Sequence, residues 1–141
     1  MVPPAIEQNP AAPFLALRQA SLVVQDGLET GDPSLVAARI AALAQVFQTQ
    51  VQPLSWEAWP RERQGLLASL RVEMHRQLRL LATDAMFLKS ARQGETIVQR
   101  RRQIGDRLTA LIGYCEVAEQ EELQFLPEPP PEPPPEPPPT P

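Results

Sequence analysis

Apolar residues recur every three or four positions through most of this chain, which is the spacing of one face of an α-helix. Short polar or proline-bounded stretches divide the pattern into four runs. The first run starts near Pro13 and ends at Gly31. The second has sharper bounds, because Asp32 can cap a helix, Pro33 fits the first helical position and Pro53 stops the run. The pattern favours an all-helical chain.

The two longest runs lie in the second half of the chain. The third begins at about residue 60 and ends at Arg92, and the Gly94 that follows suits the left-handed position after a helix. Thr96, with Gln99 three residues later, predicts a capping box for the fourth helix. Apolar residues in that helix step by four and three, as in a helix packed against an antiparallel neighbour. We therefore predict an all-α, antiparallel four-helix bundle whose two long C-terminal helices form a hairpin.

Polar residues interrupt the apolar faces of both long helices. Gln77 and Asp84 lie in the stripe of the third helix, and Arg101 lies in that of the fourth. If the hairpin folds about Gly94, Arg101 comes within a turn of Asp84. A lone buried charge is strongly unfavourable, whereas a polar pair between apolar layers fixes register. We therefore predict a structural Asp84–Arg101 pair in the seam of the hairpin, with Gln77 nearby.

Composition divides the chain into a flexible segment over residues 1–12, a helical domain over 13–126 and a Pro/Glu-rich tail over 127–141. The tail repeats three prolines and a glutamate, so it is expected to be extended polyproline II that cannot pack into the core. A solubilising or spacing role is its plain interpretation. Docking in an aromatic groove and shielding of the basic helices are the alternatives.

Two tryptophans lie in the proline-bounded link before the third helix. Trp56 and Trp59 either close the open end of the core or anchor a partner. Closing the core is the use that we expect, because no other bulky residue falls at that end.

Charge is segregated along the chain, although the net charge is only −4. Residues 61–107 hold eleven Lys or Arg against five Asp or Glu, whereas residues 116–141 hold seven Glu and no base. A basic helical body suits an acidic protein surface. Nucleic acid is the weaker alternative, because the consecutive residues Arg100, Arg101 and Arg102 point in three directions and the pI of about 5.0 opposes broad phosphate affinity.

The sequence holds no arrangement typical of catalysis or of a metal or cofactor site. His75 is the only histidine, and Glu73, two residues away, points to a different helix face. Neither this pair nor any other has the Glu-x-x-His spacing of carboxylate metal bundles. Cys115 lies on the predicted apolar seam, where a small buried thiol is the ordinary explanation. We predict a protein that is not an enzyme and that uses no cofactor.

Cysteine usage and hydropathy indicate where the chain resides. One cysteine cannot form an internal disulfide, and no positively charged start precedes an apolar run, so we expect cytoplasmic residence. No stretch approaches the roughly 20 apolar residues of a membrane span. The sequence leaves open whether the chain forms a homodimer, since the short first helix leaves one edge of the bundle less covered.

A set of spaced residues through the second, third and fourth helices forms a recognisable pattern. Its members are Phe47-Gln48, Pro53-Leu54, Glu73 to Leu81, Asp84, Phe87-Leu88, Ala91-Arg92, Arg100, Arg107-Leu108, Leu111 and Tyr114-Cys115. In this pattern, which covers about residues 35–118, the chain resembles the cyanobacterial family called heterocyst frequency control protein PatD.

The resemblance implies a small helical regulator, without enzymatic activity, that contacts the cell-division protein FtsZ. It also implies an effect on FtsZ assembly and, in filamentous species, on how often heterocysts form. FtsZ is acidic on balance, so an arginine-rich helical face suits it electrostatically. The basic positions expected to contact the partner are Arg76, Arg79, Arg92 and Arg100.

Overall fold

The described residues of the computed structural model are 12–55 and 61–125, with side chains described up to residue 120. These residues are all-α, as the sequence predicts, and no strand occurs among them. Trp56, Trp59 and residues 127–141, here called the Pro/Glu segment, lie outside the described residues. The helices are α1 (Ala12–Asp26), α2 (Pro33–Val46), the π-helix η2 (Phe47–Val51), α3 (Arg61–Ser90) and α4 (Gly94–Phe125).

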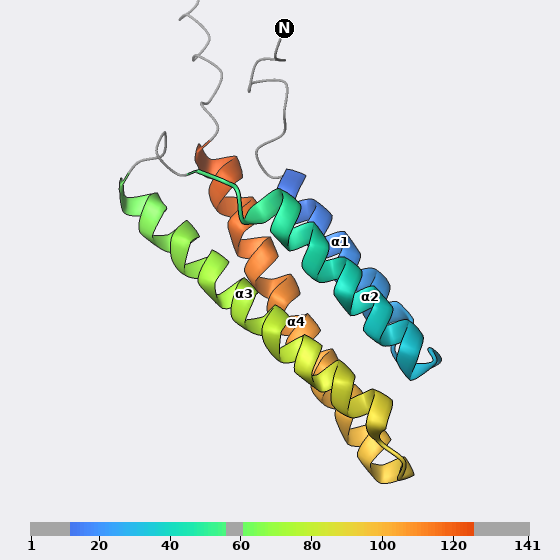
Figure 1. The fold of residues 1–141 in the computed structure, drawn as a ribbon. Coiled ribbons are helices and arrows are strands. Elements are labelled where there is room, and N and C mark those ends of the chain that lie inside the picture. The colour runs from blue at the N-terminus through green and yellow to red at the C-terminus, as the bar shows by residue number, and fades with distance from the viewer. Residues whose placement is uncertain (1–11, 56–60, 126–141) are drawn as a thin grey trace, which may run out of the picture.

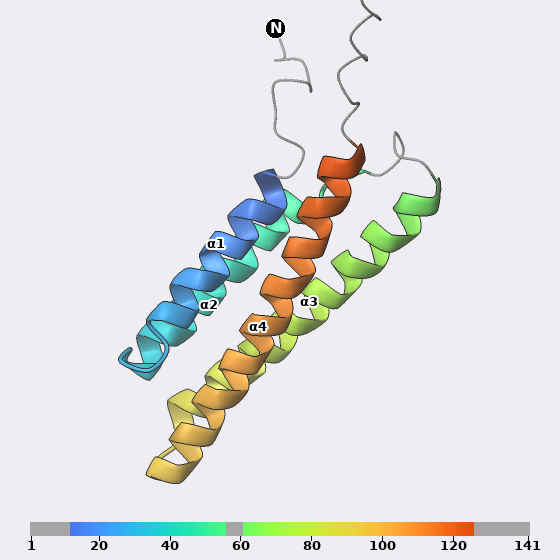
Figure 2. The ribbon, with the colours of Figure 1, turned by 180° about the vertical axis from the view of Figure 1, so that it is seen from behind.

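Each long helix runs opposite to the one before it, as both views of the ribbon show (Figure 1, Figure 2). α1 contacts α2 and α4, and α3 also contacts α2 and α4. The four helices therefore surround a shared apolar core. The π-helix η2 directly continues α2 and also contacts α1.

The core follows the apolar stripes that the sequence predicts for the two long helices. Every member of the α4 stripe from Ile104 to Ala118 is fully buried, and burying each large side chain contributes about 1.5–3 kcal/mol. The stripe of α3 faces it with Leu67, Leu70, Met74, Leu78, Leu81, Ala85 and Leu88. Within the described residues, no helix combines the length and the apolar composition that a bilayer crossing requires.

The connection between α1 and α2 is a tight turn that starts earlier than predicted. α1 ends at Asp26, and the turn begins at Gly27, four residues before the predicted end at Gly31. Gly31 is needed within the turn, since a Cβ there would lie 2.5 Å from the carbonyl oxygen of Gly27. The start of α2 is as predicted: the Asp32 carboxylate accepts from the Ser34 N–H at 3.3 Å, and Pro33 is the first helical residue.

The connection between α3 and α4 differs from the prediction. α4 already begins at Gly94, so Thr96 and Gln99 lie inside the helix and the predicted capping box is wrong. The carbonyl of Gln93 accepts from the Ile97 N–H at 3.0 Å and so closes the first turn. No glycine within the described ranges has a positive φ, so the left-handed role expected of Gly94 is wrong as well.

Two arginines fasten the helices from outside the core. Arg18 of α1 donates from Nε and Nη2 to the two carboxylate oxygens of Glu119 of α4, at 2.8 and 3.1 Å. The hydrogen bond to Glu119 raises the pKa of Arg18. Arg71 of α3 donates to the carbonyl oxygens of Gln52 and Leu54, at 3.3 and 2.8 Å. α4 is thereby tied to α1, and α3 to the chain that follows η2.

The buried thiol of Cys115 makes stability depend on alkaline pH. Burial raises its pKa from the ordinary 9.0 to about 12. Its contribution to folding is therefore complete below about pH 9 and is lost as pH rises toward 12. We expect a loss of about 2 kcal/mol between pH 7 and pH 10.5, measured by urea unfolding. Cys115→Ala should lack this component, and equal pH slopes in the two proteins would contradict the assignment.

Candidate functional site

The seam between α3 and α4 contains a buried carboxylate. The side chain of Asp84 is only 5% exposed, and its Oδ2 accepts a hydrogen bond from Nε of Arg107. Nη1 of Arg100 approaches the other oxygen, Oδ1, at 3.9 Å. A carboxylate this deeply buried requires a charged partner, so the pair with Arg107 is structural. Gln77 lies close by, lining a shallow depression together with Arg107.

Arg101 does not pair with Asp84, so that prediction is wrong. Its guanidinium donates to the carbonyl oxygens of Glu29 and Gly31, the latter at 3.1 Å from Nη2. The expected level along the hairpin was nearly right, because Asp84 lies between Arg100 and Arg107. The helix face predicted for Arg101 was wrong. Arg100 and Arg107 are two turns apart on the side of α4 that faces α3, whereas Arg101 is on the side that faces the turn after α1.

Helix length explains the position of Arg101. The hairpin of α3 and α4 extends beyond the turn that joins α1 and α2 (Figure 1, Figure 2). An apolar residue at this level would face the polar backbone of that turn. Arg101 instead supplies donors to the carbonyl groups of this turn, which lie past the last residue of α1.

The outward side of α3 carries a second 4-3-4-3 repeat, which the sequence analysis did not single out. Its members, here called the outer stripe, are Val72, Arg76, Arg79, Thr83 and Met86. Val72 is 65% exposed, Met86 is 72% exposed and the Arg76 side chain is 68% exposed. Apolar and basic side chains therefore alternate on an uncovered helix face.

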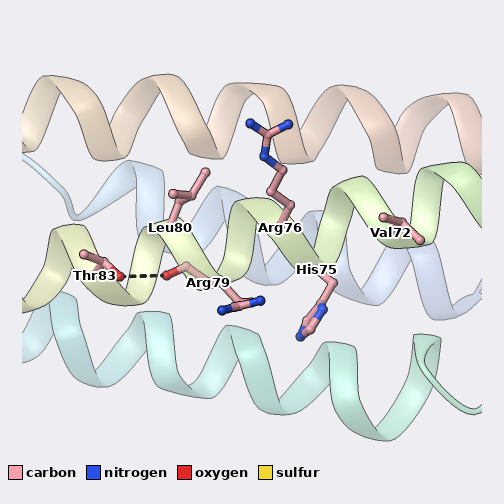
Figure 3. A pocket seen from close by; sticks show the side chains of 6 residues that line it. All are labelled: Val72, His75, Arg76, Arg79, Leu80 and Thr83. Atoms are coloured by element: carbon pink, nitrogen blue, oxygen red, sulfur yellow. Dashed lines mark hydrogen bonds between the residues drawn. The ribbon is translucent and has the colours of Figure 1, made fainter.

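The middle of the outer stripe is hollowed into a shallow depression of about 320 Å³. In Figure 3, Arg76 and Leu80 point toward the α4 side of α3, whereas His75 and Arg79 point toward α2. The depression thus lies between two diverging arginines. Its lining residues are Val72, His75, Arg76, Arg79, Leu80 and Thr83.

An aromatic pair supports one side of this depression. The ring of His75 stacks on that of Phe47, with centroids 5.7 Å apart and planes within 6°. Phe47 is 1% exposed and opens the π-helix η2. Because a π-helix adds a residue to one turn, it shifts the side chains around it, and such turns often occur near functional sites. Apolar periodicity gives no signal for this turn.

The four arginines expected at a partner site do not form one cluster. Arg76 and Arg79 share the outer stripe, and Arg76 approaches Glu73 at 3.8 Å in an exposed ion pair that contributes little. Arg92 is exposed just beyond α3. Arg100 is partly buried and stacks over the Phe87 ring at 4.5 Å, while approaching Asp84. Two of the four therefore face outward together.

The outer stripe combines two exposed arginines with exposed apolar side chains. Within the described ranges, no three His, Cys, Asp or Glu side chains come together in a group that could hold a metal ion. No family model, curated protein or solved structure matches the chain. A function of the outer stripe is therefore inferred from its geometry. Arg76 and Arg79 lie at fixed spacing and are flanked by the exposed side chains of Val72 and Met86.

A double-mutant cycle distinguishes the observed pair from the one first predicted. Arg107→Met should destabilise the chain by about 3 kcal/mol, because Asp84 then stays buried without its main partner. We expect a coupling free energy of about 1–3 kcal/mol between Asp84→Asn and Arg107→Met in urea unfolding followed by circular dichroism. The control cycle, Asp84→Asn with Arg101→Met, should give less than about 0.5 kcal/mol. Equal coupling in both cycles would contradict the structural assignment.

Proposed function

We propose that the chain is an antiparallel four-helix bundle that acts as a non-enzymatic adaptor, binding the cell-division protein FtsZ through the outer stripe of α3. Binding modulates the assembly of FtsZ, and in a filamentous cyanobacterium it would connect cell division with heterocyst frequency. The observation that carries this proposal is the exposed pair Arg76 and Arg79 between uncovered apolar side chains.

The composition of the outer stripe supports an acidic protein as the partner. Arg76 and Arg79 can form two-pronged hydrogen bonds to carboxylates, and Val72 and Met86 offer apolar area beside them. Arginine and methionine are both enriched at protein interfaces. The rigid helix holds these groups at fixed spacing, which lowers the entropy cost of docking.

Nucleic acid remains the second candidate, and the contacts of the arginine triplet weaken it. Arg100 stacks on Phe87, and Arg101 donates to the turn after α1. Of the triplet, only Arg102 is exposed, whereas Arg100 and Arg101 are half-buried. A phosphate backbone needs several exposed cations along its path, and the triplet supplies one.

Co-sedimentation with FtsZ polymers tests the proposal. The purified chain should pellet with polymerised FtsZ, and Arg76→Glu with Arg79→Glu should weaken binding by about tenfold or more, because two attractive contacts become repulsive. Binding should also fall as salt is raised, since the contacts are exposed to solvent.

The control variant carries the same change of charge elsewhere. Arg61→Glu with Arg102→Glu reverses two exposed arginines outside the outer stripe and should pellet nearly as well as the parent chain. A gel shift with random duplex DNA at moderate salt accompanies the pelleting. DNA binding without co-sedimentation, or equal losses in the two double variants, would overturn the proposal.

A further inference from the structure

The course of α4 brings the Pro/Glu segment to the end of the molecule where α3 begins. α4 runs back along α3 and ends at Phe125, at the same end of the molecule as Arg61 (Figure 1, Figure 2). Residues 127–141, which follow after Leu126, include eleven prolines and three glutamates. Whatever follows α4 therefore starts near the helix that carries the outer stripe.

The length of the Pro/Glu segment matches the distance to the depression. Arg76 lies fifteen residues beyond Arg61, which is about 22 Å along the helix. Fifteen residues of polyproline II extend about 45 Å, so the segment reaches this level with enough left to cross the width of a helix. At about 3.1 Å per residue, the part that arrives beside Arg76 is close to Glu132.

The chemistry of the Pro/Glu segment also matches that of the outer stripe. The carboxylate of Glu132, which comes closest to this level, complements Arg76 and Arg79, and these have no buried acidic partner among the described residues. Proline rings pack well on aromatic and aliphatic surfaces, and the depression offers the stacked ring of His75 between Val72 and Leu80. Polyproline II is extended before it binds, so docking costs little conformational entropy.

We propose that the Pro/Glu segment docks on the outer stripe of its own chain, with Glu132 against Arg76 and Arg79, and covers this face until an acidic partner displaces it. The inference uses the face assigned above to the partner, but it does not require that partner to be FtsZ.

Attachment makes even a weak contact effective. A short tether gives the segment an effective concentration of about 1 mM, so a contact with a Kd of about 1 mM between separate molecules is half formed within one chain. An acidic partner with a lower Kd then competes successfully. Such a segment tunes the affinity of the face without closing it permanently.

A spin label on the segment tests the contact in the full-length chain. Pro133→Cys introduces a thiol directly beside Glu132, whereas Cys115 is fully buried and unreactive toward the label in the folded protein. We expect paramagnetic broadening of the amide signals of α3 between Val72 and Met86. The α1/α2 groove around Val23 and Ala42 serves as the internal control and should stay sharp.

Charge-neutral variants decide whether the contact is the proposed one. Glu128→Gln, Glu132→Gln and Glu136→Gln together, or Arg76→Gln with Arg79→Gln, should remove most of the broadening. No broadening on α3, broadening of the α1/α2 groove, or broadening that survives both sets of substitutions would overturn the proposal. So would broadening as strong in a mixture in which label and isotope are on different molecules, because the contact would then join two copies.

The same variants separate this inference from the proposed function. If the contact exists and FtsZ is the partner, the glutamate-to-glutamine chain should pellet with FtsZ more strongly than the parent, by about twofold at a half-occupied face. Broadening on α3 without co-sedimentation would retain the internal contact and reject FtsZ. Co-sedimentation without broadening would retain FtsZ as the partner and reject the internal contact.

Discussion

A buried carboxylate fixes how the two long helices face each other. The carboxylate of Asp84 has its main cationic partner only where Arg107 reaches it, and sliding α4 by one turn would break that pair while keeping apolar residues opposite one another. The apolar stripes alone would tolerate such a slip, because both helices carry apolar residues every three or four positions. The ion pair therefore contributes specificity of register more than stability, and it also fixes which side of α3 is turned outward.

Unequal helix lengths give the second constraint. α3 and α4 are about twice as long as α1 and α2. The core enclosed by four helices therefore gives way to a hairpin of two helices at the level of Arg101. At that boundary the arginine binds the carbonyl groups of the neighbouring turn, where an apolar side chain would leave them without donors. Beyond it, Leu88 is still fully buried, while Met86, Phe87 and Val98 are exposed at 72, 48 and 56%. The projecting end thus keeps a narrow core and presents apolar side chains to its surroundings.

Sequence periodicity could predict what depends on one helix at a time. The stripe from Ile104 to Ala118 and the Asp32 cap are such features, and both are confirmed. The destination of Arg101 depends on where a different helix ends, and the π-helix that begins at Phe47 leaves no mark in the apolar spacing, so neither could be predicted from one helix alone. The outer stripe was visible as a second 4-3-4-3 repeat. A repeat by itself does not reveal which of two stripes is covered by neighbouring helices.

Positive and negative side chains are unevenly distributed along the long axis of the molecule. Along α4, Arg100, Arg101 and Arg102 lie toward the projecting end of the hairpin, whereas Glu116 and Glu119 lie toward the end where α3 starts, so α4 carries a charge dipole along its length. An acidic partner should therefore be attracted to the projecting end and to the outer stripe, because the glutamates at the opposite end of α4 repel its negative charge. The Pro/Glu segment starts at that acidic end. Folding back along α3 would carry its glutamates toward the basic middle of the molecule, lower the repulsion at the acidic end and weaken the dipole. An internal contact and an external partner would then draw on the same attraction, which is why one can regulate the other without any change in the helices.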